Sequence, residues 1–465
     1  MSHTLFAPDA LLPSGWATHV LLQWNDNGVL THVQPGSTAP PGTPHAPGPL
    51  IPGMPNLHSH AFQRAFAGLT EYRGQHTDGG QDSFWSWRTL MYRFANRITP
   101  DQLLAIATWL YVEMLEAGYT SVCEFHYVHH DLNGQPYADD ATLAHCLLQA
   151  ARQTGMGLTL LPVLYQTSGF GATAPTEGQR RFVRSTDNML RLLEQTLPAI
   201  KAQGAALGLA PHSLRAVPPA ALAEAVAGMH ALDSAAPIHI HIAEQTAEVD
   251  ASLAWSGQRP VEWLLNHAPV DERWCLVHAT HMTADEYRRA AQTGAVAGIC
   301  PSTEANLGDG LFDMPQWLAH GGAWGVGSDS HATVNAAEEL MLLEYGQRLQ
   351  RHQRNVLASA THAQVATAMT LQAVQGGAQA AARPIGGLAV GQQADMLSLD
   401  PTHLALDGLA APQMLSAHVF ASHRTSAVQH VWTGGQPVVH NGRHALHDEA
   451  ARAFVTARRA IVTES

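Results

Sequence analysis

Between residue 51 and about residue 380, short apolar segments alternate with longer segments of helical pattern. This alternation is typical of βα units, in which a helix follows each strand of a parallel sheet. The eight apolar segments are residues 50–60, 120–128, 158–166, 205–213, 237–245, 275–280, 295–302 and 323–331. Eight strand–helix units over about 330 residues predict an α/β fold, a (β/α)8 barrel of the TIM type. An open doubly wound sheet fits the same alternation, but no glycine-rich phosphate loop follows the first strand.

Both ends of the chain read differently from this middle part. Residues 1–50 contain short β-type segments and finish in a stretch rich in proline and glycine, and similar β segments return after residue 383. Neither end is long enough to bury a hydrophobic core by itself. The sequence therefore predicts a small β-sandwich domain built from residues 1–50 and 384–465, with the catalytic barrel at residues 51–383 inserted between them.

The composition excludes several functional classes. A formal charge of -13 argues against a nucleic-acid partner. No run of eighteen apolar residues is present, so we expect no membrane span and no membrane partner. The first twenty residues lack the pattern of a secretory signal, and the four cysteines form no CxxC pair. We therefore expect a cytoplasmic protein that acts on a small molecule.

Candidate catalytic residues gather at the predicted strand ends, where barrels of this type carry their active sites. His58 and His60 are two residues apart on the first strand, so both imidazoles lie on one face. His239 and His241 repeat this spacing on the fifth strand, and His241 is the better candidate because Glu244 follows it. With 29 histidines in the chain, about two His-x-His pairs are expected by chance, so the spacing alone proves little. The argument rests on the position of both pairs at predicted strand ends.

Two further strand ends complete the set of candidates. His278 ends the sixth strand, and Asp329 lies just after the eighth. Imidazole nitrogens from several strands together with one carboxylate form a three- or four-ligand metal site with an open position for water. An imidazole-rich ligand set favours Zn²⁺, while iron and manganese remain open.

The order His-x-His, His-x-x-Glu, His and Ser-Asp resembles the amidohydrolase superfamily in its mononuclear deaminase branch, and so does the segment GGLAVGQQADMLSLD at residues 386–400. The resemblance covers essentially the whole chain. It implies one metal ion per chain, usually zinc, and a catalytic group in which Glu244 moves protons and His278 polarises the substrate. It implies the metal ligands His58, His60, His241 and Asp329. Asp329, which is a carboxylate, can accept the proton that a metal-bound water loses.

The single lysine discriminates within this superfamily. In the dinuclear branch, a carbamylated lysine at the end of strand four bridges two metals. Here the fourth strand ends in LAPHSLR, and Lys201 lies well upstream. A bridging lysine is absent from the position that would need it, so we expect a single-metal site.

Two arginines near strand ends indicate the substrate. Arginine binds carboxylates bidentately, so Arg88 and Arg215 reaching one pocket would suit a substrate with two carboxylates, such as a glutamate moiety. The segments NLHSHAFQR, DSFWSWR, EFHYVHH, APHSLRAV and HIHIAEQ resemble the amidohydrolases that deiminate N-formimino-L-glutamate in histidine degradation. That resemblance implies a hydrolase acting on a linear amidine, a homodimer, and substrate binding by Gln63, Arg88, Tyr127, His212 and Arg215.

Three expectations stay open beside this interpretation. The long segment 64–97, which carries Phe84, Trp85 and Trp87, is a candidate lid over the site. A deaminase of a purine or related heterocycle, of the guanine type, would share the metal site and differ only in its pocket. A catalytically dead relative serving as a binding module would keep the barrel and bind no metal.

Overall fold

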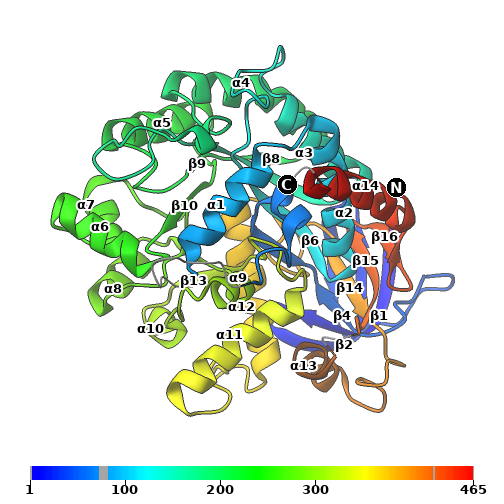
Figure 1. Ribbon diagram of the computed structural model, residues 1–465. Coiled ribbons are helices and arrows are strands. Elements are labelled where there is room, and N and C mark those ends of the chain that lie inside the picture. The colour runs from blue at the N-terminus through cyan, green and yellow to red at the C-terminus, as the bar shows by residue number, and fades with distance from the viewer. Residues whose placement is uncertain (1–2, 73–81, 423–424, 464–465) are drawn as a thin grey trace.

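A computed structural model describes residues 3–72, 82–422 and 425–463 (Figure 1). Every predicted barrel segment contains a strand, and the fourth strand consists of two short pieces. The barrel strands are β5 (Met54–Ser59), β6 (Tyr119–His126), β7 (Gly157–Leu164), β8 (Ala206–Leu207) with β9 (Ala210–Pro211), β10 (Ile238–Ile242), β11 (Trp274–His278), β12 (Val296–Ile299) and β13 (Ala323–Val326). The predicted strand positions are therefore confirmed.

These strands form two parallel sheets that meet at both edges. One sheet runs from β5 through β6 and β7 to β8, and the other from β10 to β13. A parallel bridge joins Leu209 to Ile238, and a second joins Ser59 to Asp329. The second bridge brings the first and the last strand together beside His58 and His60, and the two bridges close the barrel.

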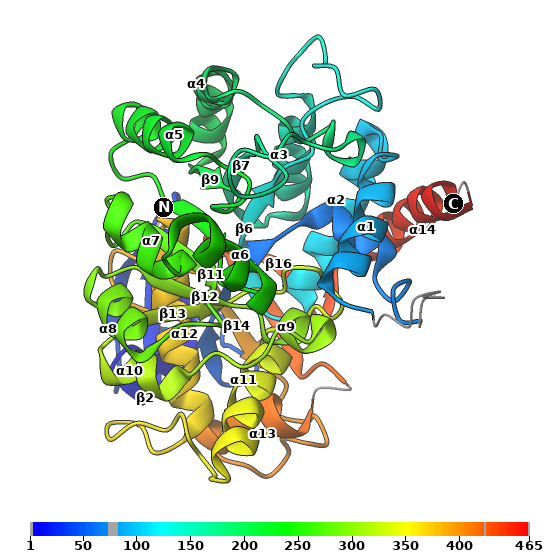
Figure 2. The same ribbon diagram turned by 60° about the vertical axis from the view of Figure 1, so that its left-hand side comes forward.

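Helices surround the barrel strands (Figure 2). Their bounds are η1 (Ala61–Phe66), α1 (Phe84–Ala95), α2 (Pro100–Glu116), α3 (Thr142–Thr154), η2 (Glu177–Gln179), α4 (Thr186–Gln203), α5 (Pro219–Leu232), α6 (Thr246–Ser256), α7 (Pro260–His267), α8 (Ala284–Gln292), α9 (Pro301–Leu307), α10 (Met314–Ala319), α11 (Ala336–Arg351) and α12 (Val365–Ala381). Helices α2 and α4 have clear end signals in the sequence. Thr99 caps α2 ahead of Pro100 at its first position, and Gly204 ends α4 in the left-handed conformation at φ 67°.

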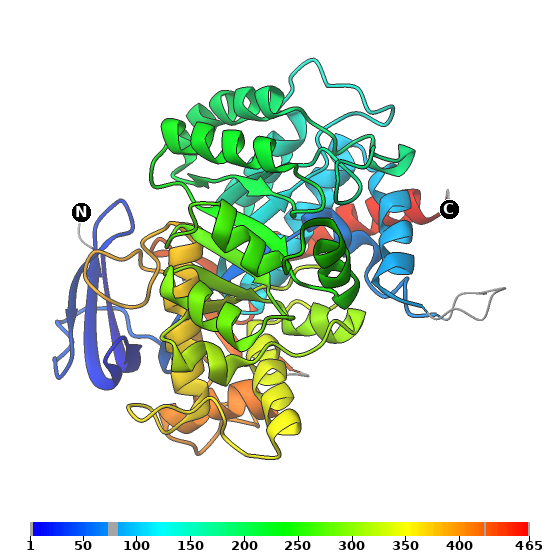
Figure 3. The ribbon, with the colours of Figure 1, turned by 90° about the vertical axis from the view of Figure 1, so that its left-hand side faces the viewer.

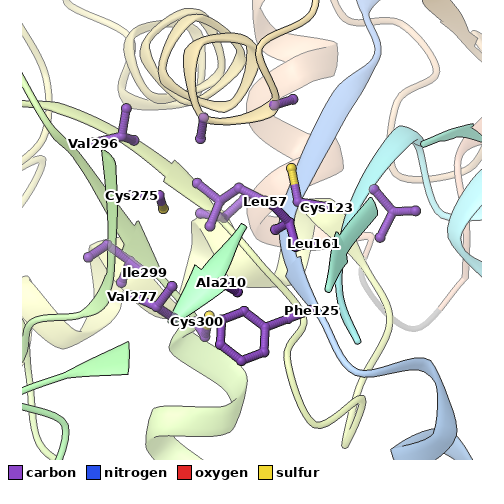
Figure 4. Packing of buried hydrophobic residues seen from close by; sticks show 14 of the residues in the cluster. Leu57, Cys123, Phe125, Leu161, Ala210, Cys275, Val277, Val296, Ile299 and Cys300 are labelled. Carbon is purple, nitrogen blue, oxygen red and sulfur yellow. The ribbon is translucent and has the colours of Figure 1, made fainter. Parts of the chain in front are cut away.

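The barrel interior is filled by small and medium-sized apolar side chains. Figure 4 shows Leu57 on β5, Cys123 on β6, Leu161 on β7, and Cys275 and Val277 on β11 pointing into this core. All of them are buried, as are the partners around them. The interior is thus a packed core rather than a channel, and any site must lie at its rim. Among the described helices, none is long and apolar enough to cross a membrane.

Strands from both ends of the chain form a separate eight-stranded sheet in the order β17-β16-β15-β14-β4-β1-β2-β3. Their bounds are β1 (His3–Leu12), β2 (Gly15–Trp24), β3 (Leu30–Gln34), β4 (Leu50–Pro52), β14 (Met396–Leu399), β15 (Val428–Thr433), β16 (Gln436–His440) and β17 (Arg443–His444). Strands β1 to β3 lie on one side of the barrel, and α1 lies on the opposite side (Figure 3). The predicted first barrel strand is two strands, because the chain passes between the sheets at Gly53, where an added Cβ would lie 2.2 Å from Thr120.

The C-terminal part differs from its expected β-rich character. Two helices, α13 (Ala411–Ala421) and α14 (His447–Thr463), lie among its strands. Helix α14 packs along α2 (Figure 1), where Phe454 stacks on Trp109 at 6.2 Å between ring centroids. Its buried residues Ala450, Phe454, Ala457 and Ile461 recur at helical spacing, so the signal for this helix was present in the sequence.

Candidate active site and metal centre

Four side chains from three parts of the barrel rim converge on one point. His58 and His60 come from the end of β5, His241 from β10, and Asp329 from the turn after β13. One ligand atom from each lies within 4.8 Å of the others. The Nε2 atom of His58 lies 3.1 Å from that of His60 and 2.9 Å from that of His241. The Nε2 atom of His60 lies 3.1 Å from Asp329 Oδ1.

The protons on these imidazoles show why a cation fits between them. His60 donates its Nδ1 proton to the carbonyl of Phe125 at 2.9 Å, and His241 donates its own to the carbonyl of His212 at 3.1 Å. A neutral imidazole carries only one proton, so both Nε2 atoms present lone pairs toward His58 and Asp329. Lone pairs at such distances repel unless a positive ion lies between them. The donor set, three imidazoles and a carboxylate, suits a divalent transition metal.

Burial keeps the imidazoles of His58 and His241 neutral. The His58 side chain is 0% exposed, and burial lowers its pKa to about 3, although Asp329 works in the opposite direction. Burial also holds the pKa of His241 well below its ordinary value. For Asp329, burial would raise the pKa, but the adjacent His58 and His60 side chains hold it well below its usual range. Neutral imidazoles and an ionised carboxylate are the forms that bind metal.

The backbone is strained at the strand ends that carry the reactive groups. His278 adopts φ 65° and Asp329 φ 42°, in the left-handed region that non-glycine residues seldom occupy. Ala243, next to Glu244, has φ 50°. Such conformations cost about 1–3 kcal/mol each and persist where the surrounding structure imposes them. Here they turn side chains from three strands toward the same point.

Glu244 and His278 form a second group next to the ligand cluster. The Nε2 atom of His278 lies 3.7 Å from Glu244 Oε1 and 3.7 Å from Asp329 Oδ2. Burial raises the pKa of Glu244 to about 7, although His278 counteracts it. Burial would lower the pKa of His278, but the carboxylates of Glu244, Glu304 and Asp329 raise it to about 10. The pair therefore offers an imidazolium beside a carboxyl group that can exchange protons at neutral pH.

The five residues expected to bind substrate all line one cavity together with every residue of the two groups above except His58. Its lining includes Gln63, Arg88, Tyr127, His212 and Arg215 as well as His60, His241, Glu244, His278 and Asp329. Gln63 Nε2 donates to the Tyr127 hydroxyl at 3.0 Å, while Gln63 Oε1 is buried with no partner among the described residues. A polar ligand is therefore expected there, because buried polar atoms are rarely left unpaired.

The two arginines approach each other across a tryptophan. The guanidinium carbon of Arg88 lies 4.3 Å from the Trp85 ring centroid, and that of Arg215 lies 5.8 Å from it. Neither arginine forms an ion pair with a carboxylate in the described part of the chain, and Arg88 Nη1 is buried without a partner. Burial lowers the pKa of Arg88, and repulsion by Arg215 adds to this effect. Two such cations in one cavity favour an anionic ligand.

Other polar residues near the barrel strands lie outside the ligand cluster. His239 Nε2 donates to the carbonyl of Ala380 at 2.8 Å, on the side of α12. Glu124 accepts from Ser59 Oγ at 2.7 Å and from the backbone of Ala61 at 2.6 Å. Lys201 lies exposed in the last turn of α4, remote from the end of the fourth strand. Glu124 therefore holds the residues on either side of His60 in place and does not join the ligand cluster.

Several residues at the site were not among the candidates from the sequence. Glu304 on α9 accepts from His278 Nδ1 at 3.2 Å, so the helix that follows the seventh strand contributes to the site. Glu248 accepts from the backbone of Ala243 and Glu244, which fixes the turn that carries Glu244. Asp309 lies within 4.8 Å of Glu244 and His278 and accepts from Gln245. An acid one helical turn after a strand end was the signal that could have found Glu248 and Glu304.

The segment 64–97 is partly helical. Phe84, Trp85 and Trp87 lie on α1 and line the cavity, so the aromatic residues of the candidate lid do border the site. Residues 73–81 of this segment lie outside the described residues.

A closed barrel with imidazole and carboxylate ligands at the carboxyl ends of its strands defines a metal-dependent hydrolase of the barrel class. The model of the amidohydrolase family matches residues 50–438. The formimidoylglutamate deiminase of Pseudomonas aeruginosa is 49% identical over 97% of this chain and 98% of its own length. The chain belongs to the amidohydrolase family, whose members are metal-dependent.

Two further relatives place the chain within this family. A crystal structure of an amidohydrolase from Brucella melitensis superposes with a TM-score of 0.93 at 47% identity, covering 99% of this chain and 100% of that one. The 5-methylthioadenosine/S-adenosylhomocysteine deaminase of Natronomonas pharaonis is 25% identical over 84% of this chain and 81% of its own. The identity to the Pseudomonas deiminase is thus about twice the identity to this deaminase.

Proposed function

We propose that the chain is a hydrolytic deiminase that converts N-formimino-L-glutamate and water to N-formyl-L-glutamate and ammonia, a step of histidine degradation. The observation that carries this proposal is a single cavity lined both by residues of the metal-ligand cluster and by two arginines that have no ion-pair partner among the described residues. A substrate with an amidine at one end and two carboxylates at the other matches both. The name of the Pseudomonas relative supports the same substrate.

The ligands His58, His60, His241 and Asp329 would hold one Zn²⁺ ion, and their chemistry leaves iron and manganese as alternatives. When bound, such an ion supplies Lewis acidity that polarises the amidine and activates water near neutral pH. One ion per chain is expected because the fourth strand ends in His212 without a lysine nearby.

The residues of the chain divide the remaining work. Gln63, Arg88, Tyr127, His212 and Arg215 bind the glutamate part and hold the formimino carbon toward the ligand cluster. Water adds to that carbon, and Asp329 accepts a proton from the attacking water. Glu244, with its pKa near neutrality, passes a proton to the nitrogen that leaves. The protonated His278 stabilises negative charge that develops on the attacking oxygen.

The products follow from the bonds that change. A C–O bond forms between water and the formimino carbon, and the C–N bond to the terminal nitrogen breaks. The two protons of water, one by way of Glu244, leave with that nitrogen as ammonia. The remaining carbon is the formyl group of N-formyl-L-glutamate.

The direct test is ammonia release from N-formimino-L-glutamate by the purified protein. We expect turnover that is lost on chelation and restored by Zn²⁺. Turnover of guanine without turnover of the formimino substrate would establish the heterocycle deaminase instead. Protein that binds no metal and turns over neither substrate would be the dead binding module.

The proposal includes a cytoplasmic homodimer. All four cysteines are free, which suits a reducing compartment. The dimer rests on likeness to relatives, and light scattering of the purified protein would measure it.

A further inference from the structure

A buried tyrosine that follows strand β7 contacts residues that line the cavity. Tyr165 directly follows β7, and its side chain is fully buried. Its hydroxyl lies 2.6 Å from Gln179 Nε2, 3.3 Å from the Tyr92 hydroxyl and 3.4 Å from Arg215 Nη1. Tyr165 does not line the cavity, whereas Tyr92 and Arg215 do. It therefore touches two lining residues from behind.

The direction of each hydrogen bond can be worked out. The backbone N–H of Thr176 donates to Gln179 Oε1 at 2.7 Å, which fixes the amide so that Nε2 faces the tyrosines. Gln179 Nε2 and Arg215 Nη1 can only donate, so the Tyr165 oxygen accepts from both. Its single proton then goes to the remaining partner, the hydroxyl of Tyr92.

This direction determines where Tyr92 donates. The Tyr92 oxygen accepts from Tyr165 and, at 3.4 Å, from Gln179 Nε2. Its own proton has no acceptor among the described residues, although Tyr92 lines the cavity. Arg88 lies over the same ring, with its guanidinium carbon 5.5 Å from the centroid. The Tyr92 proton is thus available to a ligand held by the arginines.

We propose that Tyr165 is a positioning residue for substrate specificity: its hydroxyl orients Arg215 and Tyr92 so that their remaining donors face a substrate carboxylate, and Tyr92 is itself a further carboxylate-binding residue. This inference rests on the proposed function, because it assumes a dicarboxylate substrate. Gln179 shares the role by holding the Tyr165 oxygen from the other side.

The network should affect binding more than turnover. Arg215 is long and flexible, and without Tyr165 its guanidinium would sample several rotamers. The donor of Tyr92 would lose the hydrogen bond that turns it toward the cavity. Neither change touches His58, His60 or Asp329, so metal content and turnover at saturating substrate should be kept.

The test compares Tyr165→Phe with Tyr287→Phe as a matched control. Tyr287 on α8 is also buried, and its hydroxyl also holds a partner, the backbone N–H of Asp313 at 2.8 Å, but it lies outside the cavity lining. Each variant is assayed as metal-loaded protein on three substrates. These are N-formimino-L-glutamate, N-formimino-L-glutamine, which lacks the side-chain carboxylate, and N-formimino-4-aminobutyrate, which lacks the α-carboxylate.

We expect Tyr165→Phe to raise KM for N-formimino-L-glutamate about tenfold with kcat within about twofold. The preference for the dicarboxylate over one of the two analogues should fall by the same factor, and Tyr287→Phe should leave both preferences unchanged. An equal loss on all three substrates would mean a merely structural role and would overturn the inference. Tyr92→Phe should weaken the same preference, and its failure to do so would remove Tyr92 from the proposal.

A second variant keeps the inference testable if Tyr165→Phe does not fold. Gln179→Leu removes the opposing hydrogen bond and should reproduce the loss of preference, so it decides the question if Tyr165→Phe does not fold. Unchanged preference in every folded variant would overturn the inference. If instead the wild-type protein did not turn over N-formimino-L-glutamate, the proposed function itself would have failed, which is a separate result.

Discussion

The two ends of the cavity are built by different kinds of structure. At the metal end, His58, His60 and Asp329 are tied by backbone bonds across the barrel seam, since Asp329 N–H donates to the His58 carbonyl at 3.0 Å. At the other end, Arg88 comes from helix α1 and Arg215 from the loop after β9, and their contacts are with side chains such as Trp85. The barrel fixes the chemistry, while the surrounding helices and loops fix the substrate.

The largest expected effect is at the metal end. Asp329→Asn removes the only charged ligand of the cluster, so bound metal should fall below one ion per ten chains. Turnover should fall about 10³-fold, because it loses both the ion and a proton acceptor. Elemental analysis and the ammonia assay measure the two losses. Asp285→Asn, an exposed aspartate on α8, is the matched control. Full metal content with turnover reduced less than tenfold would show that the cluster is not the metal site.

The opposite end should separate binding from metal retention. Arg215→Met should raise KM about 100-fold, the value of a lost charge-assisted pair with a carboxylate. Metal content should stay unchanged, and kcat should change only a few-fold. Arg191→Met, at an exposed arginine on α4, controls for the loss of one positive charge. Equal losses of metal and substrate binding would contradict the division of the cavity into two ends.

The same division explains what the sequence could predict. The strand-end candidates, among them His58, His60, His241 and Asp329, follow from two rules, namely that side chains alternate along a strand and that the ends of parallel strands share one rim. The choice of these four as metal ligands came from the resemblance to the amidohydrolases. The eight strands followed from hydrophobic pattern alone. Residues such as Tyr165 lie beyond these rules, because the role of Tyr165 depends on how Gln179, Tyr92 and Arg215 pack around it.

Local backbone turns set a second limit. Glu304 reaches His278 only because helix α9 begins directly after β12, and Glu248 acts through backbone N–H groups. In the same way, the break at Gly53 divides one apolar run between two sheets. The sequence did not reveal this break, because the hydrophobic pattern is continuous across it. Hydrophobic periodicity identifies a strand but does not say which sheet it joins.

The smallest expected effect concerns a buried histidine far from the cavity. Burial lowers the pKa of His418 on α13 to about 4, whereas in the unfolded chain it is near 6.5. Between those values the unfolded chain binds the extra proton, so the contribution of His418 to stability is present above pH 6.5 and is lost as pH falls toward 4. His418→Gln should therefore reduce the loss of unfolding free energy between pH 7 and pH 4.5 by up to about 2 kcal/mol.

Urea unfolding at both pH values measures this difference, with metal-loaded protein in each case. Protonation of the ligand histidines contributes equally to wild type and variant, so it cancels in the comparison. His320→Gln, at an exposed position, is the control and should leave the pH dependence unchanged. Metal content and turnover should be unaffected, because His418 belongs neither to the cavity lining nor to the ligand cluster. Burial alone is enough to lower a histidine pKa, whereas metal binding also requires that Nε2 atoms converge. An unchanged pH dependence in His418→Gln would mean that this histidine is protonated at little cost in the folded protein.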